Sequence, residues 1–561
     1  MAFRTTQRAP RSCFACSSRK VKCDKNVPCS TCIKRGQADA CAREMVIVRG
    51  AVTTWTDAPD LLTYDELKDE NQRLRDEIEL LKRQQVSISP ASRGEKLRRS
   101  LGNDDELEKR LWKLVSASSP PSPMATDWGS ILMPSRQCSE QLVEFDRIWN
   151  SWVHYALEYP SFEIECDEFY AELEKGGALE EYDPAWLAVY FAVLSAALLM
   201  MAEDEATRVF LPQGEPTAFF SRILHLSSIA QCSIGFDQRR AGKMWYDASI
   251  FCLHRSDFMR TRSIRSVQAV AILGMCFNNW GDSDLDVHLW SCALRIAQTI
   301  SLHDPPSSTT NILSAEGQRR LWWTLMIVEW MRVPYQIPQV DEVDFDMSLP
   351  VSTMTPDENM HVDPVHYHIF MARAATAYYR FCVAIRAAVK PVEEAVRKAD
   401  EELAEVINTL PEYLKPDNSG SEHVRQLEEA HPWVKWQRFD VTVVLLHLRV
   451  RISRALQAQW QAEPQRYSWA KTISVTSAMS VIWINHNWDQ PASMRKQWAL
   501  SFHVFVAATL LLREHQTVPD DQNEAYWDSM NTALYLLDQV KDQSAVAQQA
   551  AVILRAEINK E

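Results

Sequence analysis

The spacing of apolar residues changes along the chain. Over residues 137–561, apolar residues recur every three or four positions, and no stretch alternates convincingly as a strand does. The clearest helical segments are 186–201, 264–277, 287–300, 316–330, 366–388, 434–457, 471–484 and 497–513. The pattern predicts a large all-α domain over 137–561.

The longest apolar run, 186–201, is interrupted by Ser195 and flanked by acidic residues. It falls short of the roughly 20 residues of a membrane-spanning helix, so we expect a buried helix and no membrane partner. The first residues of the chain lack the apolar core of a secretory signal. Seven cysteines in apolar contexts are typical of reduced thiols in a cytosolic or nuclear protein: Cys138, Cys166, Cys232, Cys252, Cys276, Cys292 and Cys382.

Residues 61–85 follow a heptad pattern instead. The core positions are Tyr64, Asn71 and Ile78 at a, and Leu67, Leu74 and Leu81 at d. In a parallel dimer Glu70 faces Arg75 of the second copy and Glu77 faces Lys82, which are attractive pairs. Asn71 at an a position favours two strands. The pattern predicts a short parallel coiled coil and a homodimer; the alternative is an amphipathic helix packed on its own domain.

The remaining stretches show no sustained period. Residues 1–12 are a basic arm, 42–60 a linker, and 86–136 a flexible linker containing Ser and Pro. Within the last, 103–115 can form a short helix with Asn103 as N-cap. Ser119 and Ser122, each followed by proline, are candidate phosphorylation sites, although a plain tether explains them equally well.

Charge separates the beginning of the chain from the rest. The net formal charge is −14, yet residues 1–50 hold 11 Lys and Arg against 3 Asp and Glu. A basic N-terminal region on an acidic body indicates a polyanionic partner for that region alone.

The basic region also carries six closely spaced cysteines in the pattern C-x2-C-x6-C-x5-C-x2-C-x8-C: Cys13, Cys16, Cys23, Cys29, Cys32 and Cys41. Two C-x2-C pairs are typical of zinc sites. Two tetrahedral sites need eight ligand positions, and six cysteines fill them if two sulfurs bridge. The pattern predicts a binuclear centre with two Zn²⁺ ions; the alternative is three disulfides in a secreted mini-domain.

Three cations, Arg19, Lys20 and Lys22, lie between the second and third cysteines. We expect short helices after each C-x2-C pair to present them as a compact positive tip. Such a tip suits double-stranded DNA, because phosphates provide affinity and guanine edges in the major groove provide specificity. The alternative is an ordinary solvated charged surface.

Residues 13–41 resemble the DNA-binding domain of the fungal binuclear zinc-cluster transcription factors. The resemblance implies one zinc held by Cys13, Cys16, Cys23 and Cys29, and a second held by Cys13, Cys29, Cys32 and Cys41, with Cys13 and Cys29 bridging. It also implies that Lys20 reads a CGG-type triplet, that Arg19 and Lys22 contact the DNA backbone, and that Pro28 lies between the two halves. Ser17 departs from the arginine often found there, so we expect weaker or redistributed backbone contacts.

Residues 266–306 and 317–350 resemble the middle regulatory domain of the same family. The matching positions are Gln268, Trp290, Ala293, Ala297, Gln298, Leu302, His303, Arg319, Arg320, Trp322, Trp323 and 344–350. The chain departs at Glu329 and Trp330 and at 333–335. Trp322 and Trp323 must face different sides of a helix. Arg319 and Arg320 begin that helix against its dipole, so we expect an acidic partner elsewhere in the domain.

Signatures of catalysis are scarce. The sequence contains no GxSxG, Walker, GxGxxG or HExxH motif. His361, His366 and His368 suggest a metal site, but 366 and 368 are too close to share one helix face. The sequence predicts that the protein is not an enzyme.

Together these features predict a nuclear, sequence-specific, DNA-binding RNA polymerase II transcription factor that binds paired CGG-type triplets as a homodimer. Activation is the favoured role, with the transcription machinery or co-regulators as partners and a small-molecule effector for the helical domain. The family resemblance adds an association with biosynthetic gene clusters. The alternative is a transcriptional repressor or a ligand-sensing interaction protein.

Overall fold

The computed structural model describes residues 4–5, 10–44, 46–48, 51–53, 105–118, 127–210, 238–304, 312–332, 338–352, 362–387, 391–416, 420–489, 492–517 and 520–560. The chain divides into two compact units, Met1–Ser89 and Pro90–Glu561, which are described separately. The predicted coiled coil, Asn103, both Ser-Pro sites, Cys232, His361 and 333–335 lie outside the described residues.

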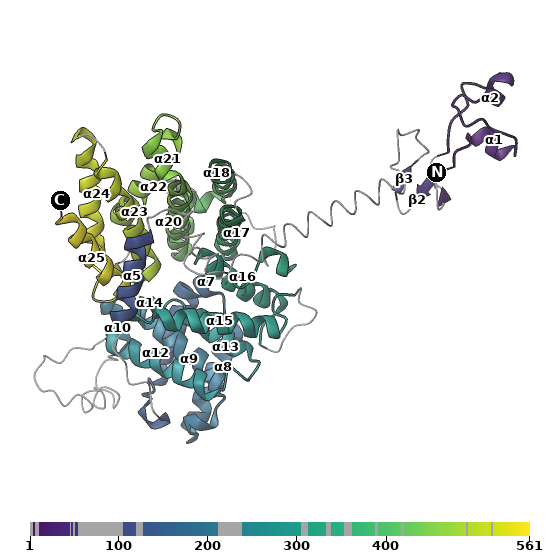
Figure 1. Cartoon of the computed structure of the whole chain (residues 1–561). Coiled ribbons are helices and arrows are strands. Elements are labelled where there is room, and N and C mark those ends of the chain that lie inside the picture. Colours follow the sequence, from purple (N-terminus) through teal and green to yellow (C-terminus); the bar gives the residue numbers. More distant parts are fainter. Residues whose placement is uncertain are drawn as a thin grey trace, which may run out of the picture. The chain divides into compact units, whose positions relative to one another are not determined.

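The first unit holds two short helices, α1 (Phe14–Ser18) and α2 (Ser30–Lys34) (Figure 1). It also holds a three-stranded sheet in the order β1 (Arg4–Thr5), β2 (Val46–Val48) and β3 (Ala51–Thr53). β1 pairs in parallel with β2, and β2 pairs antiparallel with β3. We expected a basic arm at 1–12 and a linker at 42–60, so these strands add short structure to both. The β-branched residues of β2 favour it.

Helices are the only regular secondary structure among the described residues of the second unit. Its α-helices are α5 (Asp105–Ser118), α6 (Arg136–Phe145), α7 (Ser151–His154), α8 (Tyr159–Glu174), α9 (Pro184–Met200), α10 (Glu203–Phe210), α12 (Gln238–Arg255), α13 (Ile264–Leu273), α14 (Phe277–Trp280), α15 (Ser283–Thr299), α16 (Ala315–Met331), α17 (Val365–Ala387), α18 (Val392–Asn408), α19 (Glu422–Ala430), α20 (Trp433–Ser453), α21 (Gln457–Ala462), α22 (Ser468–Asn487), α23 (Trp498–His515), α24 (Asp520–Asp538) and α25 (Ala545–Ile558). A π-turn (Asp146–Asn150) and 3-10 turns (Trp128–Ser130, Leu179–Glu181, Glu342–Asp344, Glu412–Leu414, Arg454–Leu456 and Ala492–Lys496) join some of them. The predicted all-α domain is confirmed.

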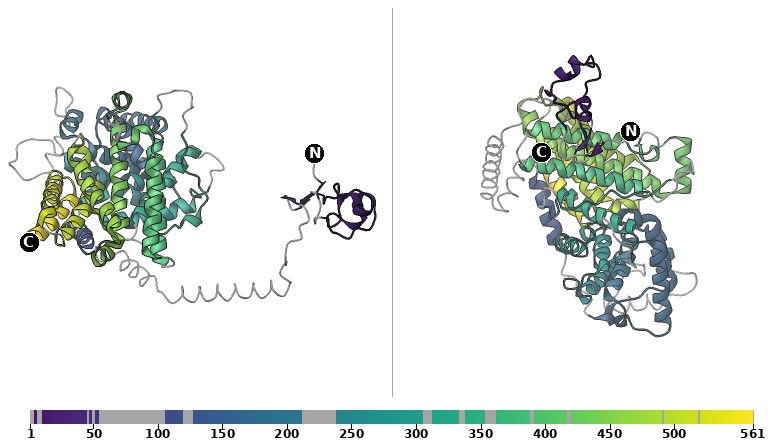
Figure 2. Two further views of the ribbon diagram at one scale, coloured as in Figure 1. Left: turned by 90° about the horizontal axis from the view of Figure 1, so that it is seen from above. Right: turned by 90° about the vertical axis from the view of Figure 1, so that its right-hand side faces the viewer.

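Helices α8 to α15 form one group and α17 to α25 another, as Figures 1 and 2 show in their blue-teal and green-yellow colours. α9 lies at the centre of the first group and packs on α12 and α13. Asp183 caps it by accepting the Ala185 N–H at 2.9 Å, and 15 of its 17 residues are buried. A helix that is apolar on all sides belongs inside a core, so the run at 186–201 is a buried helix as predicted.

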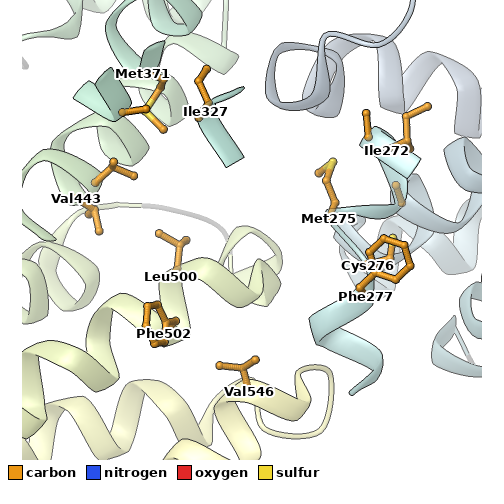
Figure 3. Packing of buried hydrophobic residues seen from close by; sticks show 14 of the residues in the cluster. Ile272, Met275, Cys276, Phe277, Ile327, Met371, Val443, Leu500, Phe502 and Val546 are labelled. Carbon is orange, nitrogen blue, oxygen red and sulfur yellow. The ribbon is translucent and has the colours of Figure 1, made fainter. Parts of the chain in front are cut away.

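Among the helices that the structure describes, we find none with both the length and the apolar character of a membrane span. One continuous apolar core joins the two groups, and Figure 3 shows part of it, with Met275, Ile327, Met371 and Phe502 contributed by different elements.

The short helix expected at 103–115 corresponds to α5, which is docked on the helical domain rather than lying free in a linker. This helix packs against α25 and α15, and its Leu111 and Val115 are fully buried. Its Glu108 is also fully buried, because Arg451 and Arg454 of the second helix group pair with it.

Candidate metal centre and DNA interface

Each C-x2-C pair opens a short helix, rather than preceding it as predicted. Cys13 is the N-cap of α1, and its Sγ accepts the N–H of Cys16 at 3.4 Å. Cys29 caps α2 in the same way, accepting the N–H of Cys32 at 3.3 Å. The helix start therefore brings both sulfurs of each pair to the same side.

The two helices also end alike. The N–H of Lys20 bonds to the Ser17 carbonyl at 3.2 Å, and the N–H of Gly36 bonds to the Ile33 carbonyl at 3.0 Å. Both Lys20 and Gly36 have left-handed backbones, with φ of 54° and 69°. This helix ending favours glycine. Lys20 therefore holds, in the first half of the module, the position that a glycine holds in the second.

Four sulfurs, those of Cys13, Cys16, Cys29 and Cys32, lie within 4.8 Å of one another. The Sγ–Sγ distances are 3.8 Å for Cys13–Cys29 and Cys13–Cys32, 3.5 Å for Cys16–Cys29 and 4.0 Å for Cys16–Cys32. Four sulfurs bound about 2.3 Å from a tetrahedral zinc stand about 3.8 Å apart. The spacing therefore fits a thiolate metal site.

The other two cysteines lie at the rim of this group. The Cys23 Sγ lies within 4.8 Å of the Cys29 Sγ, and the Cys41 Sγ accepts the N–H of Cys29 at 3.2 Å. The structure thus brings all six predicted ligands together. The four-sulfur group contains Cys13 and Cys29, the pair common to both expected zinc sites. Its other two members, Cys16 and Cys32, belong to different zinc sites in the expected arrangement.

The pKa values of these thiols determine how much free energy is needed to deprotonate them when metal binds. Burial raises the pKa of Cys13 and Cys16. Burial also acts to raise the pKa of Cys29, but the Cys32 N–H and the neighbouring thiols outweigh it and lower the value to about 6. Since zinc binds thiolates, loading the centre expels protons. Two zinc ions with six thiolates carry a net charge of about −2, which N–H···S bonds and nearby cations offset.

Backbone contacts close the module around the cysteines. Cys13 forms an isolated antiparallel bridge with Arg43, whose Nη2 donates to the Lys25 carbonyl at 2.8 Å. Asp24, which sequence reasoning missed, accepts the Ser30 N–H at the start of α2 at 2.9 Å. Hydrogen bonds from Ser30, first from its hydroxyl and then from its N–H, lower the pKa of Asp24. The position of Asp24 directly after the third cysteine was the available signal.

The predicted DNA-contacting residues lie together on the exposed end of α1. Arg19, Lys20 and Lys22 are all exposed. Arg19 Nη1 donates to Gln37 Oε1 at 2.7 Å, which ties the two halves of the module and was not foreseen. The carbonyl of Lys22 accepts the Thr31 hydroxyl at 2.9 Å. The backbone that carries the three cations is therefore anchored to α2.

In the helical domain, the two adjacent tryptophans share a neighbour. Trp322 and Trp323 are both buried and pack on Phe345, with ring centroids 5.3 Å and 5.8 Å away. Trp323 Nε1 also donates to the Ser348 carbonyl at 2.8 Å. The residues expected to face different sides of α16 thus fasten the segment around 345–348 from two directions.

The acidic partner of Arg319 and Arg320 is Glu316, one turn earlier in the same helix. The prediction placed this partner elsewhere in the domain and is wrong. Glu316 lies in the first turn of α16, where a carboxylate is favourable to the helix dipole. It also accepts the Val351 N–H at 2.9 Å.

The described histidines of the 361–368 cluster serve packing. His366 Nδ1 lies 2.6 Å from the Tyr413 hydroxyl. His368 Nε2 lies 3.2 Å from the Thr324 hydroxyl, and its ring stacks on Tyr155. Among the described residues, the groups with metal-binding spacing all contain cysteines of the N-terminal module.

Comparison with known proteins supports the same division. Residues 11–44 match the fungal Zn(2)-Cys(6) binuclear cluster domain, which binds two zinc ions, and residues 147–363 match the fungal specific transcription factor domain. The chain is 21% identical to the probable transcription factor lepB of Aspergillus flavus, over 72% of this chain and 73% of that protein.

The chain is also 21% identical to the agnestins biosynthesis cluster transcription factor AgnL11 of Paecilomyces divaricatus, over 58% of this chain and 50% of that protein. Its fold resembles the solved K. lactis CBF3 core, with a TM-score of 0.54 and 12% identity, covering 82% of this chain and 90% of that one. The chain therefore carries a fungal Zn(2)-Cys(6) cluster domain and a fungal specific transcription factor domain, which are the domains of a zinc-containing DNA-binding regulator of transcription.

Proposed function

We propose that this protein is a nuclear regulator that reads CGG-type triplets through Lys20 and activates transcription by RNA polymerase II. The observation that carries this proposal is the placement of Lys20, a charged residue at a left-handed position filled by glycine in the other half of the module. The αL conformation disfavours side chains other than those of glycine and a few polar residues, so a lysine there has a use that offsets its cost. Arg19 and Lys22, on the same tip, contact phosphates.

The zinc ligands of this proposal are those that the resemblance to the binuclear zinc-cluster family implies. Cys13 and Cys29 bridge the two ions on this proposal, and it is supported by their place in the four-sulfur group, where each caps a helix. Cys16 and Cys23 complete one site, and Cys32 and Cys41 complete the other. Replacing a bridging cysteine therefore removes a ligand from both ions at once.

A second copy of the chain supplies the second triplet reader. The seam consists of Tyr64, Leu67, Asn71, Leu74, Ile78 and Leu81, and 42–60 sets the spacing of the two modules. Asn71→Leu tests the seam, because a leucine at this a position strengthens the coil but admits higher oligomers. Sedimentation of a strict dimer by this variant would place Asn71 outside the core.

The target genes belong to a biosynthetic cluster on this proposal, which rests on the printed description of AgnL11. Repression is the second candidate, because the described C-terminal helices α24 and α25 pack into the helical domain rather than offering a free acidic segment. A reporter with the bound sites upstream separates the two: deletion of the gene lowers expression for an activator and raises it for a repressor.

Selection from randomised duplexes with the full zinc-loaded chain tests the central claim. We expect enrichment of two CGG-type triplets at one fixed spacing. Enrichment of a single triplet contradicts the dimer, and enrichment of unrelated sequences contradicts the role of Lys20. Binding at several salt concentrations separates base reading from phosphate attraction, because only the latter falls steeply with salt.

A further inference from the structure

A cavity of about 220 Å³ lies inside the helical domain, between its two helix groups. α13, α15 and α16 line it from one side, and α17, α20 and α23 from the other. Figure 3 shows four of its lining side chains, with Ile327 and Met371 above Phe502 and Met275 opposite them. Nothing in the DNA-reading role uses this space.

The lining is suited to a small aromatic guest. Three methionines, among them Met275 and Met371, line the cavity together with aromatic residues such as Phe502 and Trp112. Methionine adapts its shape to a ligand and contacts aromatic rings favourably. An apolar cavity of about 150 Å³ accepts benzene, so 220 Å³ suits a fused two-ring molecule of about ten heavy atoms.

The wall of the cavity formed by α15 and α16 contains two buried N–H donors. Within the described residues, Trp290 Nε1 and Arg332 Nη1 have no hydrogen-bond partner. Arg332 is held in place, since its Nη2 donates to Asp286 at 2.7 Å and its guanidinium stands 4.8 Å from the Trp290 ring centroid. A buried donor without a partner costs free energy, which an oxygen acceptor in the cavity recovers.

The charged residues of the opposite wall already have partners. Arg451 Nη1 lies 3.4 Å from the Glu108 carboxylate, and Asp440 accepts the Tyr367 hydroxyl at 2.5 Å. His447 and His503 lie with ring centroids 4.1 Å apart, and burial lowers the pKa of both, to about 3 for His503. Both imidazoles are therefore neutral at physiological pH. Arg332 is neutralised by Asp286. The electrostatics favour an uncharged guest.

We propose that this cavity binds a planar, uncharged two-ring molecule whose carbonyl oxygen accepts hydrogen bonds from Trp290 and Arg332. Trp112 of α5 forms part of the wall and packs on Trp498 and Phe502, with ring centroids 5.9 Å and 5.3 Å away. A guest in contact with Trp112 stabilises α5 in its docked position. The site depends on none of the residues assigned to DNA or zinc.

Equilibrium dialysis of the full chain with coumarin, a two-ring lactone, tests the proposal, with naphthalene as the probe that lacks the oxygen. We expect one saturable coumarin per chain, bound more tightly than naphthalene. Val444→Phe on α20 adds bulk to the cavity wall and should weaken coumarin binding by at least about tenfold. Val552→Phe, at an exposed position of α25, makes the same change outside the cavity and should leave binding unaltered.

Trp290→Phe removes the indole N–H and should lower coumarin affinity towards that of naphthalene. An equal loss for both probes contradicts the hydrogen bond. Failure of coumarin to bind at its solubility limit, or equal binding by Val444→Phe and the native chain, overturns the site. If Val444→Phe does not fold, Ala271→Leu fills the same cavity from α13. Slower amide exchange across α5 with coumarin, but not across α19, checks the role of Trp112.

Discussion

The zinc module and the helical domain are held together by opposite means. In the module, five cysteines are buried while Phe14, Val27 and Ile33 remain largely exposed. The helical domain buries many of its large side chains fully, among them Trp245, Trp290, Trp322 and Trp330. A segment of some 30 residues cannot bury enough apolar surface to fold alone, so metal–sulfur bonds take the place of a core.

Zinc removal gives the largest contrast between the two. Structural zinc in small domains contributes about 10–16 kcal/mol of folding free energy, so chelation should unfold the module and abolish DNA binding. Helical-domain unfolding should be unchanged. Tryptophan fluorescence reports that domain selectively, because Trp55 is the only tryptophan before Trp112. Cys29→Ser should release both ions in metal analysis, and retention of two zinc ions would contradict bridging.

In the helical domain, the buried carboxylate of Glu108 is the group whose loss should destabilise the fold most. Glu108→Ala leaves Arg451 and Arg454 buried without their carboxylate, which should cost about 3–5 kcal/mol in urea unfolding. Glu106→Ala, two positions away and exposed, is the matched control. Zinc content should stay at two ions in both variants. Equal midpoints for the two variants would show that α5 is not fastened by this pair.

The zinc module and the buried Glu108 illustrate which features could be predicted from the sequence and which could not. The candidate zinc ligands could be predicted because all six cysteines lie within 29 residues, and their spacing alone indicates the chemistry. The docking of α5 could not be predicted from the sequence, because Glu108 and Arg454, which pair in the structure, are 346 residues apart. A fragment cut at residue 137, the predicted boundary, would lose Glu108 and Trp112. The Glu316 partner of Arg319 and Arg320 was within reach, since residues three and four apart meet on a helix.

Helix positions were predicted well where apolar residues recur without interruption. The segment 287–300 corresponds to α15 and 316–330 to α16, each within a few residues. The segment 264–277 instead divides into α13 and α14 around Gly274. A Cβ at Gly274 would stand 3.1 Å from the Trp290 ring, a contact between distant positions that periodicity does not reveal.

Acid should act on the helical domain through His447 and His503. Burial lowers the pKa of both below the usual 6.5, so their contribution is complete above about pH 6.5 and is lost as pH falls towards 3. Each histidine lowers the unfolding free energy by up to about 1.4 kcal/mol per pH unit. Asp440 opposes this between about pH 4 and 6, because burial raises its pKa to about 6. Urea titrations at pH 7, 6 and 5 should show a shallower dependence for His503→Gln than for the exposed control His486→Gln.

Substitution of Lys20 gives the smallest expected change in stability and tests DNA reading most directly. Lys20→Gly removes the side chain and also relieves the left-handed backbone, so the module should gain up to about 1 kcal/mol. Lys20→Ala removes the same amine but keeps the backbone cost. If Lys20 reads the triplet, both variants lose selectivity on a randomised-site panel to the same extent, although only the glycine variant retains zinc better against a chelator. If instead the variant that retains zinc better also keeps more of its DNA selectivity, Lys20 acts through the stability of the module and not through a base contact. Selectivity lost despite a more stable module would mean that the chain accepts the left-handed backbone of Lys20 for the sake of reading DNA.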